Sequence, residues 1–142
     1  MKCLHPTLLA LAALVSGPCW ADVYVVVSTQ SPVKSLTQRE LQDIFLSRSR
    51  TFPSGEFATP LDQPRQSPVR QEFYFRLTGM GLPEINSYWA RLSFAGQSMP
   101  PQPMATQEQL LQTLRRNPLS ISYLAHEPRQ PGLRVVLQLK DP

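Results

Sequence analysis

Asp62-Gln-Pro-Arg-Gln-Ser-Pro-Val-Arg-Gln-Glu-Phe-Tyr-Phe-Arg-Leu77 is the stretch around which the rest of the chain is arranged. It reads as a polar loop followed by a helix that begins at Ser67. Serine is a common helix cap, and the proline that follows suits the first helical position, where a missing N–H leaves no hydrogen bond unmade. Val69, Phe73 and Leu77 recur at four-residue steps. They therefore share one helix face, which we expect to pack into a core.

The start of this helix is a candidate anion site. Its first N–H groups are unpaired and the helix dipole is positive there. Arg65 precedes the helix and Arg70 lies in its first turn. Two guanidinium groups have the wrong sign for the dipole, and an oxyanion or a partner's carboxylate would relieve that conflict. The alternative is that both arginines are solvated surface charges and Ser67 is only a cap; the local sequence leaves both open.

Residues 1–21 have the pattern of a cleaved signal peptide. Lys2 gives a positive start, Leu8 to Val15 is an apolar run too short to span a bilayer, and Cys19-Trp20-Ala21 places suitable residues before the cleavage point. A lipoprotein anchor at Cys19 competes with this, but the preceding Pro18 fits it poorly. We therefore expect a periplasmic domain over residues 22–142.

The composition of this domain excludes several classes of protein. Both cysteines, Cys3 and Cys19, lie in the predicted signal peptide, which leaves no disulfide and no cysteine metal ligand. The net charge of +4 falls to +3 without Lys2, and no basic run indicates nucleic-acid binding. No other hydrophobic segment is long enough for a membrane helix. We expect one domain without a cofactor.

The segment from Val23 to Val27 is a continuous β-branched run, which is typical of a strand covered on both faces. Ser28 and Thr29 follow it. Hydroxyl residues at the carboxyl end of such a strand are candidates for a ligand site. An ordinary polar turn is the alternative.

The remaining pattern predicts a mixed order of strands and helices. Thr37 with Glu40 and Thr106 with Gln109 have the spacing of capping boxes, which mark helix starts. The sequence predicts about four helices and about four strands, which makes an α/β or α+β single domain. The helices begin near Thr37, Ser67, Pro83 and Thr106, and the strands cover Val23–Val27, Phe57–Leu61, Ser120–Leu124 and Val135–Leu139.

Several segments, in order, resemble phosphate-type periplasmic substrate-binding proteins. They are Ser35-Leu36-Thr37 to Ser47, Phe52-Pro53-Ser54-Gly55, Ser67 to Phe73, Tyr88-Trp89, and Asn117 to Leu124. The resemblance implies a type 2 periplasmic-binding-protein fold of the α/β class, in which two lobes enclose the ligand. This chain is similar to a single lobe.

The resemblance also implies a phosphate site. In the family a serine-glycine-threonine run at a helix start holds phosphate, and Ser67 matches its serine. Pro68 and Val69 stand where glycine and threonine would be. By their chemistry, Arg70 or Arg65 can supply bidentate bonds to the anion. Asp62 can likewise accept a proton from a monobasic phosphate.

Two functional hypotheses follow. The first is a periplasmic solute-binding module for phosphate or a similar oxyanion, associated with an ABC transporter, in which Ser67, Arg70 and the edge at Ser28 and Thr29 converge on one concave site. The second is an envelope protein-interaction module that keeps the fold but binds no solute. It would use a flat face without a pocket to bind an acidic partner, through Arg48, Arg50, Arg65 and Arg70.

An enzyme is the least supported class. His126 is the only histidine after residue 21, and no cysteine is left to form a nucleophile pair or metal site with it. Glu56, Asp62 and Glu72 form no recognisable acid–base pair. We therefore expect no catalytic residues and no bound metal.

Overall fold

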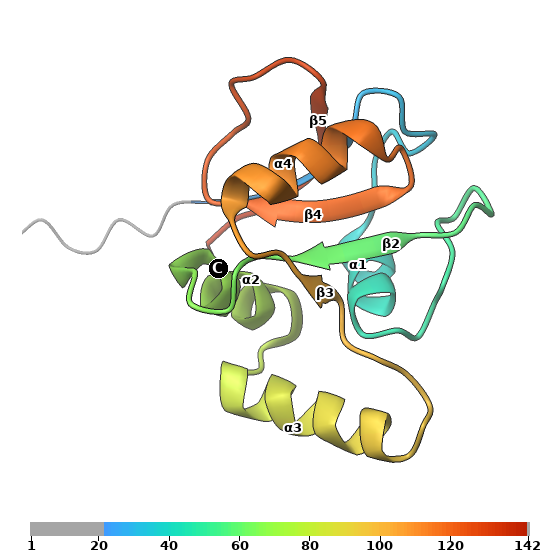
Figure 1. Ribbon diagram of the computed structural model, residues 1–142, viewed down its shortest axis with the longest axis vertical. Coiled ribbons are helices and arrows are strands. Elements are labelled where there is room, and N and C mark those ends of the chain that lie inside the picture. Colours follow the sequence, from blue (N-terminus) through green and yellow to red (C-terminus); the bar gives the residue numbers. More distant parts are fainter. Residues whose placement is uncertain (1–21, 142) are drawn as a thin grey trace, which may run out of the picture.

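The computed structural model describes residues 22–141. The predicted signal peptide, residues 1–21, lies outside the described residues. The described part is α/β, as predicted, with one five-stranded mixed sheet and four helices (Figure 1). The strands are β1 (Val23–Ser28), β2 (Thr59–Asp62), β3 (Gln102–Pro103), β4 (Ser120–Leu124) and β5 (Leu133–Leu139). The helices are α1 (Gln38–Phe45), α2 (Pro68–Thr78), α3 (Leu82–Phe94) and α4 (Gln107–Arg116).

The strands are ordered β3-β2-β4-β1-β5 across the sheet. β2 runs parallel to both β3 and β4, whereas β1 is antiparallel to β4 and to β5. As a result, β2 and β4 end at the same edge of the sheet and β1 ends at the opposite edge. The two-residue strand β3 adds to the four strands expected from the sequence.

Helices cover both faces of the sheet. On β1, Val25 and Val27 join the core cluster that includes residues of α1 and α2, and Val26 joins the cluster with Leu110 and Leu114 of α4. The alternation follows from the two-residue period of a strand. It confirms that this apolar run is buried on both sides. α3 lies farther from the sheet than α2 does (Figure 1).

Aromatic residues make the larger cluster dense. Phe73 of α2 stacks on Tyr123 of β4 with ring centroids 3.7 Å apart, and Phe45 of α1 meets Phe73 edge-on at 4.8 Å. These contacts hold α1 and α2 against the sheet next to the end of β2. They place the start of α2 beside Asp62.

The predicted helix boundaries are largely confirmed. Thr37 and Glu40 form a full capping box at the start of α1. Thr106 accepts from the backbone N–H of Gln109 at 3.1 Å, but the Gln109 side chain accepts from a different backbone N–H, so that box is half formed. Gly79 ends α2 with φ of 75°, a left-handed conformation that favours glycine. Within residues 22–141, no helix has the length and apolar character needed to cross a bilayer.

Candidate functional site

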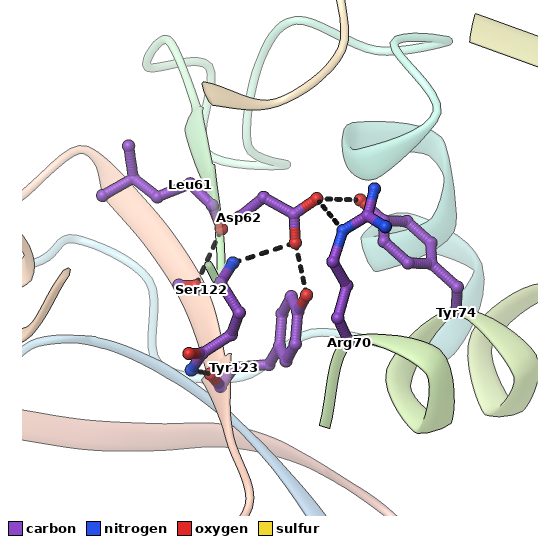
Figure 2. A network of polar contacts seen from close by, with 7 residues as sticks. Leu61, Asp62, Arg70, Tyr74, Ser122 and Tyr123 are labelled. Carbon is purple, nitrogen blue, oxygen red and sulfur yellow. Dashed lines mark hydrogen bonds and ion pairs between the residues drawn. The ribbon is translucent and has the colours of Figure 1, made fainter. Parts of the chain in front are cut away.

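Asp62, the last residue of β2, is the centre of a buried polar network (Figure 2). Its Oδ2 accepts from Arg70 Nε at 2.9 Å and from the Tyr74 hydroxyl at 3.0 Å. Its Oδ1 accepts from the backbone N–H of Gln63 at 2.9 Å and from the Tyr123 hydroxyl. Four donors occupy the four lone-pair positions of a carboxylate. Asp62 therefore has no free acceptor position with which to take a proton from a bound phosphate, which corrects the role expected from the sequence.

Regular structure positions these donors. Arg70 and Tyr74 are four residues apart on α2, so their side chains lie on one face of the helix. Tyr123 lies on β4, the parallel neighbour of β2. On the same strand, the Ser122 hydroxyl donates to the backbone oxygen of Leu61 at 2.7 Å (Figure 2). The network therefore ties α2 to two adjacent strands.

The two tyrosines are held in their protonated, donating form. Burial raises the pKa of Tyr74 well above its ordinary value, and the negative charge of Asp62 raises it further. Burial and the same carboxylate also raise the pKa of Tyr123. Both effects disfavour a phenolate in a site of low polarity. The hydroxyl groups remain hydrogen-bond donors to Asp62 over the physiological pH range.

Arg70 combines a fixed position with unused hydrogen-bonding capacity. Its side chain is 13% exposed and its guanidinium carbon lies 5.3 Å from the centre of the Tyr74 ring. Burial opposes its charge, but the charge and hydrogen bond of Asp62 outweigh that effect, and the pKa of Arg70 is raised. Only Nε is used by Asp62, so the two terminal nitrogens have no hydrogen-bond partner among residues 22–141.

A cavity of about 350 Å³ lies beside this network. It is formed by the end of β2, the loop and helix that follow, α3, and the segment before and within β3. Its lining residues are Asp62, Arg65, Arg70, Leu82, Asn86, Trp89, Pro100, Pro101 and Pro103. The volume is at the lower end of the range of about 300–1,000 Å³ that is typical of small-molecule sites.

Trp89 adds an unpaired donor to the wall of this cavity. The side chain is 5% exposed, and its buried indole N–H has no acceptor in the part of the chain that the structure describes. Buried polar groups are nearly always hydrogen-bonded, so this indole N–H is an exception among the described residues. Four side chains that carry hydrogen-bond donors line this cavity: Arg65, Arg70, Asn86 and Trp89.

The structure brings together three of the seven residues predicted to bind a ligand. Asp62, Arg65 and Arg70 line the cavity. Ser67 is the N-cap residue of α2, as predicted, but its side chain does not make the capping hydrogen bond that was expected. Neither Ser67 nor Val69 lines the cavity, and Val69 packs against the core instead.

Ser28 and Thr29 lie at the other end of the sheet from Asp62. Val27 pairs with Ile121 near the start of β4, whereas β2 and β4 run in parallel toward Asp62. Ser28 is buried, and its hydroxyl accepts from the backbone N–H of Gln30 at 3.1 Å. The expected convergence of this edge with the start of α2 is therefore wrong, because β1 runs antiparallel to the strand beside it.

Sequence reasoning missed most of the residues that complete the site. Tyr74, Tyr123 and Trp89 were not among the residues that the sequence indicated for ligand binding. All three are buried, so hydrophobic periodicity could not show that the two tyrosines also bond Asp62 or that Trp89 lines the cavity. Nothing in the local pattern of Pro100 and Pro101 indicates that they lie beside α2.

A larger cavity, about 610 Å³, is a weaker candidate for an anion. It surrounds Arg76, whose guanidinium nitrogens lie 3.7 Å from Asp22 and 3.8 Å from Asp141 and also contact Glu72. Three carboxylates around one guanidinium leave no excess positive charge. In the same part of the chain, 22–141, no cluster of His, Cys, Asp and Glu is arranged to hold a metal ion.

Comparison with known proteins supports the fold. No protein-family model and no curated protein matches the chain. A solved protein assigned as a phosphate ABC transporter substrate-binding protein, with bound phosphate, from Clostridium perfringens is similar at a TM-score of 0.56 and 15% identity, over 73% of this chain and 40% of that one. An ABC-type phosphate transport receptor from Vibrio cholerae is similar at 0.59 and 11% identity, over 82% of this chain and 46% of that one. The chain therefore shares the fold of part of such proteins and spans less than half the length of each.

Proposed function

We propose that this protein is an exported module with a periplasmic-binding-protein-like fold that binds phosphate or a similar small oxyanion in the cavity beside Arg70. The observation that carries the proposal is the position of Arg70. Its Nε is held by Asp62 at 2.9 Å, and its two terminal nitrogens are left without a partner among the described residues, in the wall of a cavity that Arg65 also lines. A guanidinium held in this way is preorganised for bidentate binding of an oxyanion.

Asp62 has a positioning role in this proposal. It fixes Arg70 through one oxygen and receives Tyr123 and the Gln63 backbone through the other. The anion contacts would come from Arg70 and Arg65. Ser67, Val69, Ser28 and Thr29, which the sequence also indicated, lie outside the cavity lining and have no part in it.

The affinity should depend on salt. Arg65 is exposed, and the solved neighbours are more than twice as long as the part of them that this chain matches. An anion bound by one lobe remains close to water, where screening weakens each ionic contact. A second protein that covers the cavity would strengthen binding. An ABC transporter permease or another envelope protein would serve in that role.

The comparisons favour a binding protein over an enzyme, since both neighbours are described as transport proteins. The cavity also favours solute binding over the second hypothesis from the sequence, an interaction module with a flat face. In that hypothesis Arg48 and Arg70 would both bind an acidic partner from one flat surface. Arg48 does lie at the surface, 3.8 Å from Asp43, but Arg70 is largely buried.

Isothermal titration calorimetry tests the proposal. The protein, purified without residues 1–21, is titrated with phosphate and with acetate at low and moderate salt. We expect saturable binding. Arg65→Ala should weaken it about fivefold, because the variant loses one partly solvated ionic contact with the anion. Arg116→Ala removes the same charge from an exposed position on α4 and should leave binding unchanged. Heats equal to dilution for both anions would overturn the proposal.

A further inference from the structure

The cavity beside Arg70 has more room than an inorganic anion needs. Its volume is about 350 Å³, whereas a water molecule occupies about 30 Å³ of liquid. A tetrahedral oxyanion of a few heavy atoms would fill only part of the cavity. The ligand that fits best has a body in addition to its anionic group.

The wall of the cavity is divided by chemistry. The charged residues Arg65 and Arg70 come from the loop after β2 and from α2. Leu82 and Trp89 of α3, with prolines of the 100–103 segment, supply apolar surface, and Asn86 adds one uncharged polar side chain on α3. Proline has no backbone N–H, so those positions offer a ligand no main-chain donor. An anionic group would therefore lie at the α2 side, and an apolar body against α3 and the prolines.

The charges in the wall match one negative charge. Arg65 and Arg70 contribute two positive charges and Asp62, 2.9 Å from Arg70 Nε, contributes one negative charge. The sum is +1. A dianion would be repelled by Asp62, whose own hydrogen-bonding positions are already occupied. The site should therefore prefer a monoanion.

We infer that the preferred ligand class is a small organic monoanion, a carboxylic acid whose carboxylate binds Arg65 and Arg70 and whose apolar body packs against Leu82 and Trp89. This inference rests on the anion-binding function proposed above and specifies the ligand. Planar carboxylates also match the two parallel donors of a guanidinium.

Calorimetric titration with acetate, hexanoate and phosphate tests the inference. Each buried methylene contributes about fourfold in affinity, so hexanoate should bind on the order of 100-fold more tightly than acetate, and more tightly than phosphate. Leu82→Ala shortens the apolar wall and should weaken hexanoate about tenfold while leaving acetate unchanged. Leu92→Ala is the matched control, since Leu92 is also half-buried on α3 but does not line the cavity.

The outcomes separate this inference from the function on which it rests. If acetate and phosphate bind in an Arg65-dependent way and hexanoate binds no better, anion binding stands and the organic ligand class is overturned. If hexanoate binds more tightly but Leu82→Ala and Leu92→Ala weaken it equally, its body lies elsewhere and the inference also fails. If no anion binds, both proposals fail.

Discussion

Asp62 and Arg70 depend on each other as a buried pair. Their side chains are 4% and 13% exposed. Removal of one member of such a pair leaves the other without compensation and destabilises a protein by about 3–5 kcal/mol. We therefore expect Asp62→Ala to lower the free energy of unfolding in urea by that amount, because Arg70 and two tyrosine hydroxyls lose their acceptor.

The surface pair between Asp43 and Arg48 is the matched control. These side chains are 35% and 56% exposed and lie 3.8 Å apart. Asp43→Ala should lower the free energy of unfolding by less than about 1 kcal/mol. Equal losses for the two aspartate variants would contradict the view that Asp62 is the centre of the site.

The tyrosines on Asp62 predict a stability change at alkaline pH. The pKa values of Tyr74 and Tyr123 are raised in the folded state, primarily by burial, and a tyrosine in an unfolded chain titrates near about 10. The contribution of the two tyrosines to the free energy of unfolding is thus fully present below about pH 10. It is lost as the pH rises toward their raised pKa values in the folded state. Urea unfolding at about pH 8 and about pH 11 should show a fall in stability.

Tyrosine-to-phenylalanine variants identify the source of that fall. The double variant Tyr74→Phe with Tyr123→Phe should be less stable at neutral pH, since two hydrogen bonds to a carboxylate are lost, but its stability should fall less at alkaline pH. Tyr24→Phe, at a half-buried position away from Asp62, should keep the alkaline fall. An unchanged alkaline fall in the double variant would contradict the assignment.

At the scale of the element, the N-cap side chains of α1 and α2 differ in the bonds they make. Thr37 at α1 accepts from the Glu40 backbone N–H at 3.2 Å, whereas the Ser67 side chain at α2 makes no capping bond. Thr37→Ala should therefore lower the free energy of unfolding by about 1 kcal/mol, and Ser67→Ala by only a few tenths. Thermal or urea unfolding of both variants checks this, and a larger loss at Ser67 would contradict the structure.

Elements were the most predictable part of this chain because their signals are local. Each of these signals affects only the residues next to it in the sequence. Examples are the capping residues Thr37 and Thr106, Gly79 at the end of α2, and the β-branched run of β1. The side-chain role of Ser67 was not predictable, since a Ser-Pro start fits a helix whether or not the hydroxyl bonds to the backbone. The short strand β3 has no pattern of its own and forms because β2 lies beside it.

At the scale of the whole molecule, predicting the site requires knowing which distant segments the fold brings together. Arg65 and Arg70 could be predicted because both lie close in sequence to the start of one helix. Trp89 and Pro101 belong to later segments, and only the tertiary fold brings those segments beside the arginines. The direction of β1 caused the error about Ser28 and Thr29: a parallel β1 would have brought Ser28 to the edge of the sheet where Asp62 lies. Sequence patterns predict strands without predicting their direction.

The described chain, although shorter than half of each solved neighbour, has helices packed on both faces of its sheet. We expect one cooperative unfolding transition in urea for the protein without residues 1–21. Phe73→Ala should destabilise it by about 3–5 kcal/mol, since this side chain is fully buried. Phe94→Ala, at a side chain 97% exposed, should change stability by less than about 0.5 kcal/mol. Two separate transitions would contradict a single folded unit.

The most direct test of anion binding beside Arg70 uses Trp89, the only tryptophan after residue 21. Its indole N–H gives a single side-chain resonance in a ¹⁵N-labelled protein, in the wall of the proposed site. Titration with phosphate, acetate and hexanoate should move this resonance saturably in the unmodified protein and in Arg116→Ala, and at higher ligand concentrations in Arg65→Ala. A resonance that stays in place for every anion, or moves identically in Arg65→Ala, would contradict binding in this cavity.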